Sequence, residues 1–271
     1  MFNQAGLYRI NNTLFDLGGT FKKAVNFCFH HEKVSCLKKN TSLVREENKE
    51  KKVYLCALGP SLKQVDLDRI KGDTIVVNRF YKFGADFPDF IPTYYVMIDY
   101  GFAEERYQKD FTDALDAYLP KGTRFLLNSK LYNSPLLEKY DKENIYFLSC
   151  YGGHMHGEKE YKMDGIFPAF QNVTGAAILS AMLMGYKEVV LLGCDFNAFA
   201  SPKQNHCYKD ASEARLWKMS WELYSSSFMA KNHDDLQEYA QRKGIVVKNS
   251  TRGSLIDAYP MEIEENLYTD A

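Results

Sequence analysis

The chain has 271 residues, of which 45% are hydrophobic, 25% charged and 14% aromatic. These proportions are typical of a globular protein with one large domain, and they exclude a disordered, collagen-like or coiled-coil chain. The formal net charge of −1 argues against a dedicated nucleic-acid binder, which needs surplus basic charge to meet phosphates. No apolar run approaches the roughly 20 residues that span a bilayer. With no secretory signal and no paired-cysteine pattern in the sequence, we expect a cytoplasmic protein with reduced thiols.

The first fifty residues differ from the rest, and we expect residues 1–50 to form a helical appendage followed by a charged linker. Phe21, Ala24, Val25, Cys28 and Phe29 recur at helical spacing and form one short apolar stripe. Two interpretations stay open. The stripe packs on the main domain, which we favour because it is short, or it anchors the chain at the anionic inner face of the cytoplasmic membrane. Residues 45–52 carry no apolar side chain, which is typical of a linker.

From residue 51 onward, short apolar runs alternate with helix-length segments. The clearest helix is predicted over 174–184, with Thr174 as its N-cap and Gly185 where it stops, and two further helical pieces are predicted within 211–243. The alternation predicts an α/β fold over 51–271, with a Rossmann-like, mostly parallel sheet and helices on both faces. The apolar runs, each typical of a buried parallel strand, lie at 53–58, 74–77, 94–98, 125–127, 145–148, 189–192 and 245–247.

Polar residues follow several of the predicted strands, and ligands of such sheets bind outside the carboxyl ends of the strands. Gly59, Pro60 and Ser61 follow the first strand. Glycine lets a ligand approach the main chain closely, and Ser61 can cap the next helix while its hydroxyl faces a phosphate. Asn78 and Arg79 follow the second strand, where an amide suits a sugar or base edge and a guanidinium suits a phosphate.

The same pattern continues at three further positions. Asp99 follows the third strand, where its carboxylate can act as a base, bind a hydroxyl or equally well cap a helix. Five polar clusters at strand and helix ends together predict a small-molecule site, most simply for a nucleotide. The remaining members are Asn172, Thr174 and Gly175 at the start of the clearest helix, and Asp195 and Phe196 after the strand 189–192.

Four segments resemble, in the same order, motifs of the bacterial sialyltransferases of glycosyltransferase family 42. They are G-P-S-L at 59–62, N-R-F-Y at 78–81, T-G at 174–175 and G-Y-K-E-V-V-L-L-G-C-D-F at 185–196. The family carries G-N-G-P-S-L, C-N-Q-F-Y, T-S-G and G-Y-K-E-I-Y-L-S-G-I-D-F. The resemblance covers about 53–200. It implies a single Rossmann-like domain, a GT-A-like variant, with a lid over the donor, which we place near 197–235.

The resemblance also implies an activity. Family 42 enzymes transfer sialic acid from CMP to a sugar hydroxyl without a strict need for metal. By likeness, this chain would move sialic acid or a related CMP-activated acidic sugar to a surface glycan such as lipooligosaccharide or capsule. Two departures stand out: Leu58 replaces an asparagine of the family, and Met229 and Ala230 stand where its catalytic histidine lies. The motifs place Gly59, Pro60, Ser61, Asn78, Arg79, Thr174, Gly175, Asp195 and Phe196 around the donor, and we add Asn172 and Tyr208.

Inverting transfer needs a base for the acceptor hydroxyl. Histidine suits this role because its ordinary pKa of about 6.5 lies near working pH. His206, in the polar segment 201–210, is the first candidate, followed by Asp99 and His233. Tyr208 and Arg79 are expected to balance the charge of the departing phosphate. The His-x-His pair at 154–156 lacks further ligands at metal-binding spacing, so we predict no metal site and no required cofactor.

Two other functions fit the same strand-end pattern. The first is a Mg²⁺-dependent pyrophosphokinase resembling the archaeal 6-hydroxymethylpterin diphosphokinases, which share the G-P-S-L start and a late G-x-D. That activity needs clustered carboxylates, for which Asp99 and Asp195 are the candidates. The second is a nucleotide-sugar-binding protein without catalysis. The expected partners are a nucleotide sugar and a glycan acceptor but no nucleic acid, and the sequence leaves an oligomer open.

Overall fold

A computed structural model describes residues 13–14, 16–18, 21, 25, 35–150, 153–200, 206–209 and 218–269. Seven parallel strands form one sheet in the order β5-β4-β3-β2-β1-β6-β7. Every predicted strand is confirmed, and the predicted α/β class with it. The strands are β1 (Lys52–Cys56), β2 (Asp73–Val77), β3 (Tyr94–Met97), β4 (Arg124–Asn128), β5 (Ile145–Leu148), β6 (Glu188–Leu192) and β7 (Val246–Asn249).

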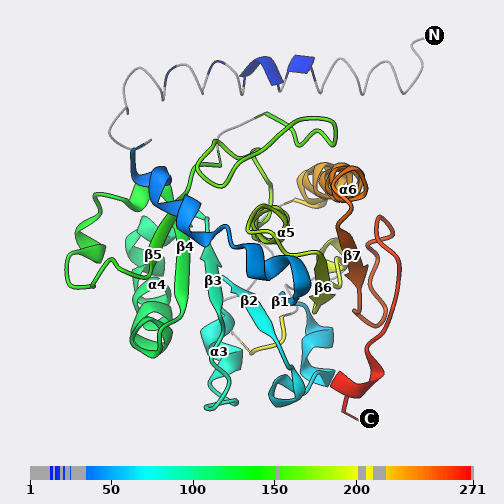
Figure 1. Cartoon of the computed structure of the whole chain (residues 1–271), viewed down its shortest axis with the longest axis horizontal. Coiled ribbons are helices and arrows are strands. Elements are labelled where there is room, and N and C mark those ends of the chain that lie inside the picture. Colours follow the sequence, from blue (N-terminus) through cyan, green and yellow to red (C-terminus); the bar gives the residue numbers. More distant parts are fainter. Residues whose placement is uncertain are drawn as a thin grey trace.

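Helices cover both faces of this sheet, as predicted. The longer ones are α3 (Phe80–Gly84), α4 (Glu105–Tyr118), α5 (Val173–Leu183) and α6 (Met219–Arg242). In Figure 1, α5 and α6 lie above the sheet, and α3 and α4 lie below it. Helix α5 contacts β1, β2, β3 and β6 and packs against α6, which also contacts β7. Among the described residues, no helix has the length and apolar character needed to cross a bilayer.

Short 3₁₀ helices fill most of the connections. The arrangement keeps the loops after the strands compact, because each of these helices turns the chain within a few residues. They are η1 (Cys36–Leu43), η2 (Glu46–Glu50), η3 (Pro60–Gln64), η4 (Leu67–Arg69), η5 (Tyr100–Ala103), η6 (Leu119–Lys121), η7 (Ser129–Leu131), η8 (Pro135–Leu137), η9 (Ala198–Ala200) and η10 (Glu265–Leu267).

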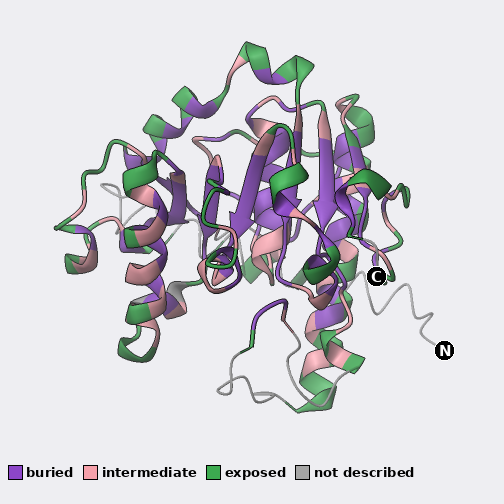
Figure 2. Ribbon diagram, turned by 90° about the horizontal axis from the view of Figure 1, so that it is seen from below, coloured by how far each residue is buried: buried purple, intermediate pink, exposed green. Residues whose placement is uncertain are grey.

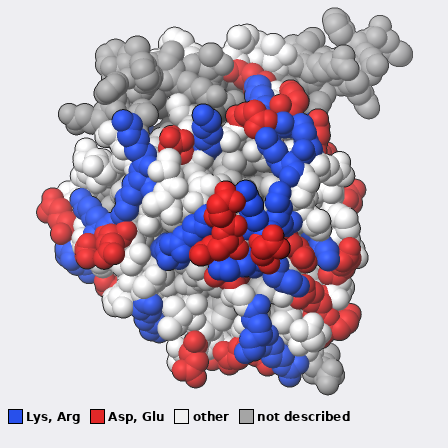
Figure 3. All heavy atoms as spheres, in the orientation of Figure 1, with Lys and Arg blue, Asp and Glu red and all other residues white. Residues whose placement is uncertain are grey.

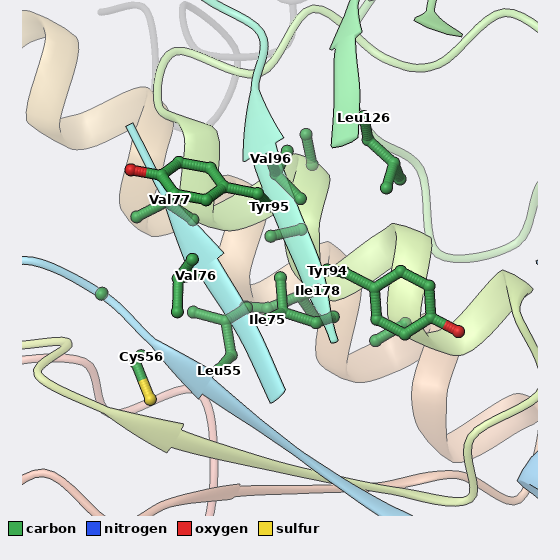
Figure 4. Close-up of a cluster of buried hydrophobic side chains, with 14 of the residues drawn as sticks. Leu55, Cys56, Ile75, Val76, Val77, Tyr94, Tyr95, Val96, Leu126 and Ile178 are labelled. Atoms are coloured by element: carbon green, nitrogen blue, oxygen red, sulfur yellow. The ribbon is translucent and has the colours of Figure 1, made fainter. Parts of the chain in front are cut away.

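The core lies between the sheet and its helices. Figure 2 shows the strands as buried and the outward surfaces of the helices as exposed. Leu55, Ile75 and Val96 of three neighbouring strands lie beside Ile178 of α5 (Figure 4), and all four are fully buried. Burying such a side chain stabilises the fold by about 1.5–3 kcal/mol. This packing holds the carboxyl ends of the strands rigidly side by side.

Part of the predicted appendage and linker packs directly on the sheet. Helix η1 contacts β5, and its Leu37 is buried. The Asn40 amide donates to the carbonyls of Phe147 and Met163, and the Asn48 amide donates to the Met184 carbonyl. Residues 36–50 therefore belong to the body of the protein. Of the predicted apolar stripe, Ala24, Cys28 and Phe29 lie outside the described residues.

Charged pairs close the amino ends of the strands. Lys52 of β1 binds Glu264 at 2.8 Å and Glu188 of β6 at 3.8 Å, and Lys248 of β7 binds Glu262 at 2.9 Å. Figure 3 shows that basic and acidic side chains are interspersed over the face of the molecule seen in Figure 1. With the amino ends covered by paired charges, the carboxyl ends of the strands are the edge at which a site can form.

Candidate functional site

The order of the strands reverses at β1, because β2 to β5 extend the sheet on one side and β6 and β7 on the other. Open parallel sheets bind their ligands at such a reversal. A cavity of about 230 Å³ lies there, between the loops after β1, β2 and β6, the start of α5 and one face of α6. Its lining includes eight of the predicted residues: Gly59, Asn78, Asn172, Thr174, Asp195, Phe196, His206 and His233.

A buried carboxylate joins the loops after β1 and β6. The Ser61 hydroxyl donates to Asp195 Oδ2 at 2.7 Å, and the Ser61 amide donates to Oδ1 at 3.2 Å. Burial raises the pKa of Asp195, and the hydrogen bonds from Ser61 oppose that rise. The amide and the hydroxyl of Ser61 therefore both donate to Asp195. This differs from the expectation that the hydroxyl of Ser61 faces a phosphate. Pro60 is the first residue of η3 and does not line the cavity.

Two residues on the cavity wall have a backbone conformation that side chains disfavour. Asn78 has φ 46° and Phe196 has φ 57°, and each follows a strand that ends at the cavity. Non-glycine residues in this region cost about 1–3 kcal/mol each, so they persist where the surroundings hold them. The Asn78 carbonyl accepts from the Tyr95 hydroxyl at 2.6 Å, while its buried side-chain Oδ1 has no hydrogen-bond partner among the described residues. Asn78 Oδ1 is thus an acceptor available to a ligand in the cavity.

Helix α5 points its amino end at the cavity. Its N-cap is Asn172, whose Oδ1 accepts from the Gly175 amide at 3.0 Å, so the prediction of Thr174 as N-cap is wrong by two residues. Thr174 lies in the first turn and lines the cavity. Gly175 does not line the cavity. It packs against Phe170 instead, since a Cβ at this position would lie 2.5 Å from the Phe170 ring. The amide groups and partial positive charge of this helix end suit a phosphate.

Substitutions at Asn172 separate capping from anion binding. Asn172→Asp keeps an equally good cap, so the free energy of unfolding should change little, while the added charge should weaken nucleotide binding about fivefold to tenfold. Asn172→Ala should lower the free energy of unfolding by about 1 kcal/mol. Chemical denaturation and calorimetric titration with CMP measure the two effects. Unchanged CMP affinity in Asn172→Asp would show that the phosphate lies elsewhere.

The segment 206–209 is held onto the loop after β1. The Cys207 amide donates to the Leu58 carbonyl at 2.9 Å, and His206 Nδ1 lies 3.3 Å from the same oxygen. A carbonyl only accepts, so this contact requires the proton on Nδ1 and leaves the lone pair on Nε2. The rings of His206 and Tyr208 stack with their centres 5.1 Å apart. The remainder of the predicted lid lies partly outside the described residues.

Arg79 was expected to meet the phosphate of a ligand, but it does not line the cavity. Its Nε binds Asp110 Oδ2 at 2.8 Å, and its guanidinium lies over the Tyr107 ring at 5.0 Å. Burial alone would lower the pKa of Arg79, but Asp110 and a hydrogen bond with Tyr208 more than offset this, and its pKa lies above the ordinary value. Arg79 and Tyr208 thus bind each other beside the cavity, and Arg79 holds the 206–209 segment rather than a phosphate.

One face of α6 forms the outer wall of the cavity. Glu222, Ser226, Met229 and His233 line it at intervals of four, three and four residues, the spacing of one helix face. The sequence reasoning missed Glu222 and Ser226. His233 Nδ1 lies 3.0 Å from the Tyr259 hydroxyl, and its buried Nε2 has no hydrogen-bond partner in the part of the chain that the structure describes. Burial lowers the pKa of His233 to about 4, so its ring is neutral at physiological pH.

The buried His233 should make the protein sensitive to acid. The unfolded chain binds a proton near the ordinary pKa of about 6.5 while the folded protein does so only near 4, so stability falls as the pH drops through this interval. The full loss is about 3 kcal/mol. His233→Gln removes the titration, and its free energy of unfolding should therefore fall less than that of the wild type between neutral and acid pH. Parallel losses in both proteins would contradict a depressed pKa at this site.

Asp99 is not brought to the cavity. It caps η5, accepting from the Gly101 amide at 2.8 Å, and it is exposed. Of the roles that the sequence left open for Asp99, the structure shows the helix cap. Its predicted role as a catalytic base has no support, because Asp99 does not line the cavity. In the described part of the chain, no group of three or more His, Cys, Asp or Glu side chains is placed to hold a metal ion.

Comparisons with known proteins return only distant solved structures. No family model and no curated protein matches the chain. It is similar to the sialyltransferase CstII from Campylobacter jejuni in complex with cytidine-5'-monophosphate, at 17% identity over 82% of this chain and 88% of that chain, with TM-score 0.46. It is also similar to the α-2,3-sialyltransferase Cst-I from Campylobacter jejuni, at 12% identity over 84% of each chain, with TM-score 0.48. At these values the likenesses assign no activity.

Proposed function

We propose that the chain is a glycosyltransferase that moves a CMP-activated sialic acid, or a related acidic sugar, to a hydroxyl of a surface glycan such as lipooligosaccharide or capsule. One observation supports this most. Residues of all four sequence motifs that resemble family 42 line a single cavity at the reversal of the sheet: Gly59, Asn78, Thr174, Asp195 and Phe196. These residues come from distant parts of the chain, and packing alone does not require the polar side chains of Asn78, Thr174 and Asp195 at this edge of the sheet.

The cavity offers suitable partners for each part of such a donor. The amino end of α5 suits the phosphate, because its amides and dipole favour an anion. Asn78 Oδ1 is a buried acceptor to which no described residue donates, and it suits a ribose hydroxyl or a base amine. The Thr174 hydroxyl lies in the same wall. Glu222 and Ser226 of α6 also line the cavity, and their side chains suit the hydroxyl groups of a sugar.

We assign the general base to His206. Its Nδ1–H donates to the Leu58 carbonyl, so Nε2 carries the lone pair that accepts the proton of the acceptor hydroxyl. As this proton leaves, the acceptor oxygen bonds to the anomeric carbon. The bond from that carbon to the phosphate oxygen breaks, and its electron pair departs with CMP. The helix end at Thr174 then stabilises the growing charge of the phosphate. We further propose that the protein works in the cytoplasm and that transfer requires no divalent metal.

A donor screen tests the function. Purified protein should bind CMP, raise its thermal midpoint in CMP, and hydrolyse or transfer a CMP-activated acidic sugar in the presence of EDTA. Magnesium-dependent binding of ATP without binding of CMP would favour the pyrophosphokinase. That alternative is less well supported, since Asp99 and Asp195 do not converge. Binding of CMP-sugars without turnover on any acceptor would point to a binding protein.

A further inference from the structure

The described turns of the N-terminal helix present large apolar side chains to solvent. Leu14, Leu17 and Phe21 are 63%, 62% and 71% exposed, and Val25 is 37% exposed. They recur at intervals of three and four residues, so they lie on one face of the helix. In Figure 1 these turns lie along the top of the molecule, beyond the sheet and its helices. Exposed apolar faces of this kind mark interaction sites.

The opposite side of this helix is the one that contacts the body. Asp16 accepts from the His154 amide at 2.8 Å, and its other oxygen lies 3.0 Å from His156 Nε2. A Cβ at Gly153 would lie 3.1 Å from the Asp16 Cα, so the backbones touch there. Residues that are two positions apart in an α-helix point in directions about 200° apart, because each residue turns the helix by about 100°. Asp16 therefore lies on the side opposite Leu14. The apolar face thus points away from the body, and the interpretation that the stripe packs on the main domain does not hold for Phe21.

Charge distinguishes between the possible occupants of this face. Residues 1–43 contain two acidic residues, and one of them, Asp16, is engaged by the histidines. The same segment contains six basic residues: Arg9, Lys22, Lys23, Lys33, Lys38 and Lys39. Lys39 is engaged as well, because its ammonium group donates to the carbonyls of Lys142, Glu143 and Ile145. With Asp16 and Lys39 set aside, five basic residues of this segment stand against one acidic residue. The whole chain has a formal net charge of −1, so this basic excess is local. Basic residues close in the sequence to an exposed apolar helix face suit an anionic lipid surface. Two copies of a basic segment would repel each other, which disfavours pairing with a second copy.

We infer that Leu14, Leu17, Phe21 and Val25 form a membrane-docking face that lies in the interface of an anionic phospholipid bilayer. The helix lies on the membrane and does not span it. Asp16 and its two histidine partners fix the helix on the body with this face outward. The inference goes beyond the proposed glycosyltransferase activity and does not depend on it.

Sedimentation of the full-length protein with phosphatidylcholine vesicles, with and without phosphatidylglycerol, tests the inference. The protein should bind the anionic vesicles and be released by high salt, whereas neutral vesicles should bind it weakly. Leu17→Glu and Phe21→Glu should each weaken binding about tenfold or more. Lys22→Glu combined with Lys23→Glu should reduce the salt-sensitive part of binding. Ile91→Glu is the matched control, because Ile91 is 49% exposed in a loop elsewhere.

Several outcomes would overturn the inference. Equal sedimentation with both kinds of vesicle, or equal loss of binding in Ile91→Glu, would remove the role of this face. A concentration-dependent dimer that Phe21→Glu dissolves, without vesicle binding by the wild type, would assign the face to a second copy. Circular dichroism and thermal unfolding of each variant exclude misfolding as the cause.

Discussion

Replacing His206 with alanine is expected to lower kcat for sugar transfer by about 10²–10⁴-fold, the usual contribution of a general base. CMP affinity should change little, because His206 receives the acceptor proton and the phosphate is assigned to the amino end of α5. The geometry behind this expectation is the 3.3 Å contact of His206 Nδ1 with the Leu58 carbonyl, which requires the proton on Nδ1 and leaves the lone pair on Nε2. Single-turnover transfer and CMP titration measure the two quantities separately.

His233→Gln is the matched control, because it also replaces a histidine of the cavity wall. We expect a smaller loss of kcat, since a ring whose pKa is about 4 is a weak acceptor of protons at neutral pH. The pH profile adds a second criterion. If His233 were the base, activity would persist in acid down to its pKa of about 4 and disappear below it. If His233→Gln lost more kcat than His206→Ala, and activity persisted in acid down to about pH 4, His233 would be the general base.

The sheet was predictable because each strand is a short run of apolar residues buried on both faces. Val53 and Val76, for example, are fully buried in neighbouring strands, and a run of such residues permits few alternatives. Parallel strands then place their carboxyl ends at one edge, so Asn78 and Asp195 could be expected near each other without any knowledge of contacts. The convergence of the motif residues follows from topology.

The roles of individual polar residues were harder to predict from the sequence than the sheet was. Arg79 follows a strand and has the charge for a phosphate, but Asp110, 31 residues later, occupies its guanidinium. The hydroxyl of Ser61 is likewise taken by Asp195, 134 residues later. Local sequence does not report such long-range partners. The face of α6 was obscured for another reason: Trp221 and Leu223 beside Glu222 are exposed, so the apolar residues of that turn do not mark its buried side.

Gly59→Ala is expected to abolish detectable CMP binding and to lower the free energy of unfolding by about 1–3 kcal/mol, the usual cost of overpacking. A Cβ at this position would lie 2.5 Å from the Gly193 carbonyl oxygen and closer still to the Asp195 carboxylate. The backbone of Gly59 is extended, with φ −65°, so the reason for glycine here is space and not conformation. The Gly59 amide also donates to the Gly193 carbonyl at 2.8 Å, which ties the two loops together.

Relief of this clash can come only from separating the loops after β1 and β6, because the Gly193 oxygen is backbone and has no rotamer to change. That movement would displace Asp195 from Ser61 and widen the cavity at its base. Gly18→Ala is the control, because Gly18 is helical and a Cβ there meets nothing within 4 Å, so stability should hold or rise slightly. Thermal unfolding with and without CMP compares the two variants. Normal CMP binding by Gly59→Ala would mean that the loops part without cost and that the carboxylate bridge between them does not shape the site.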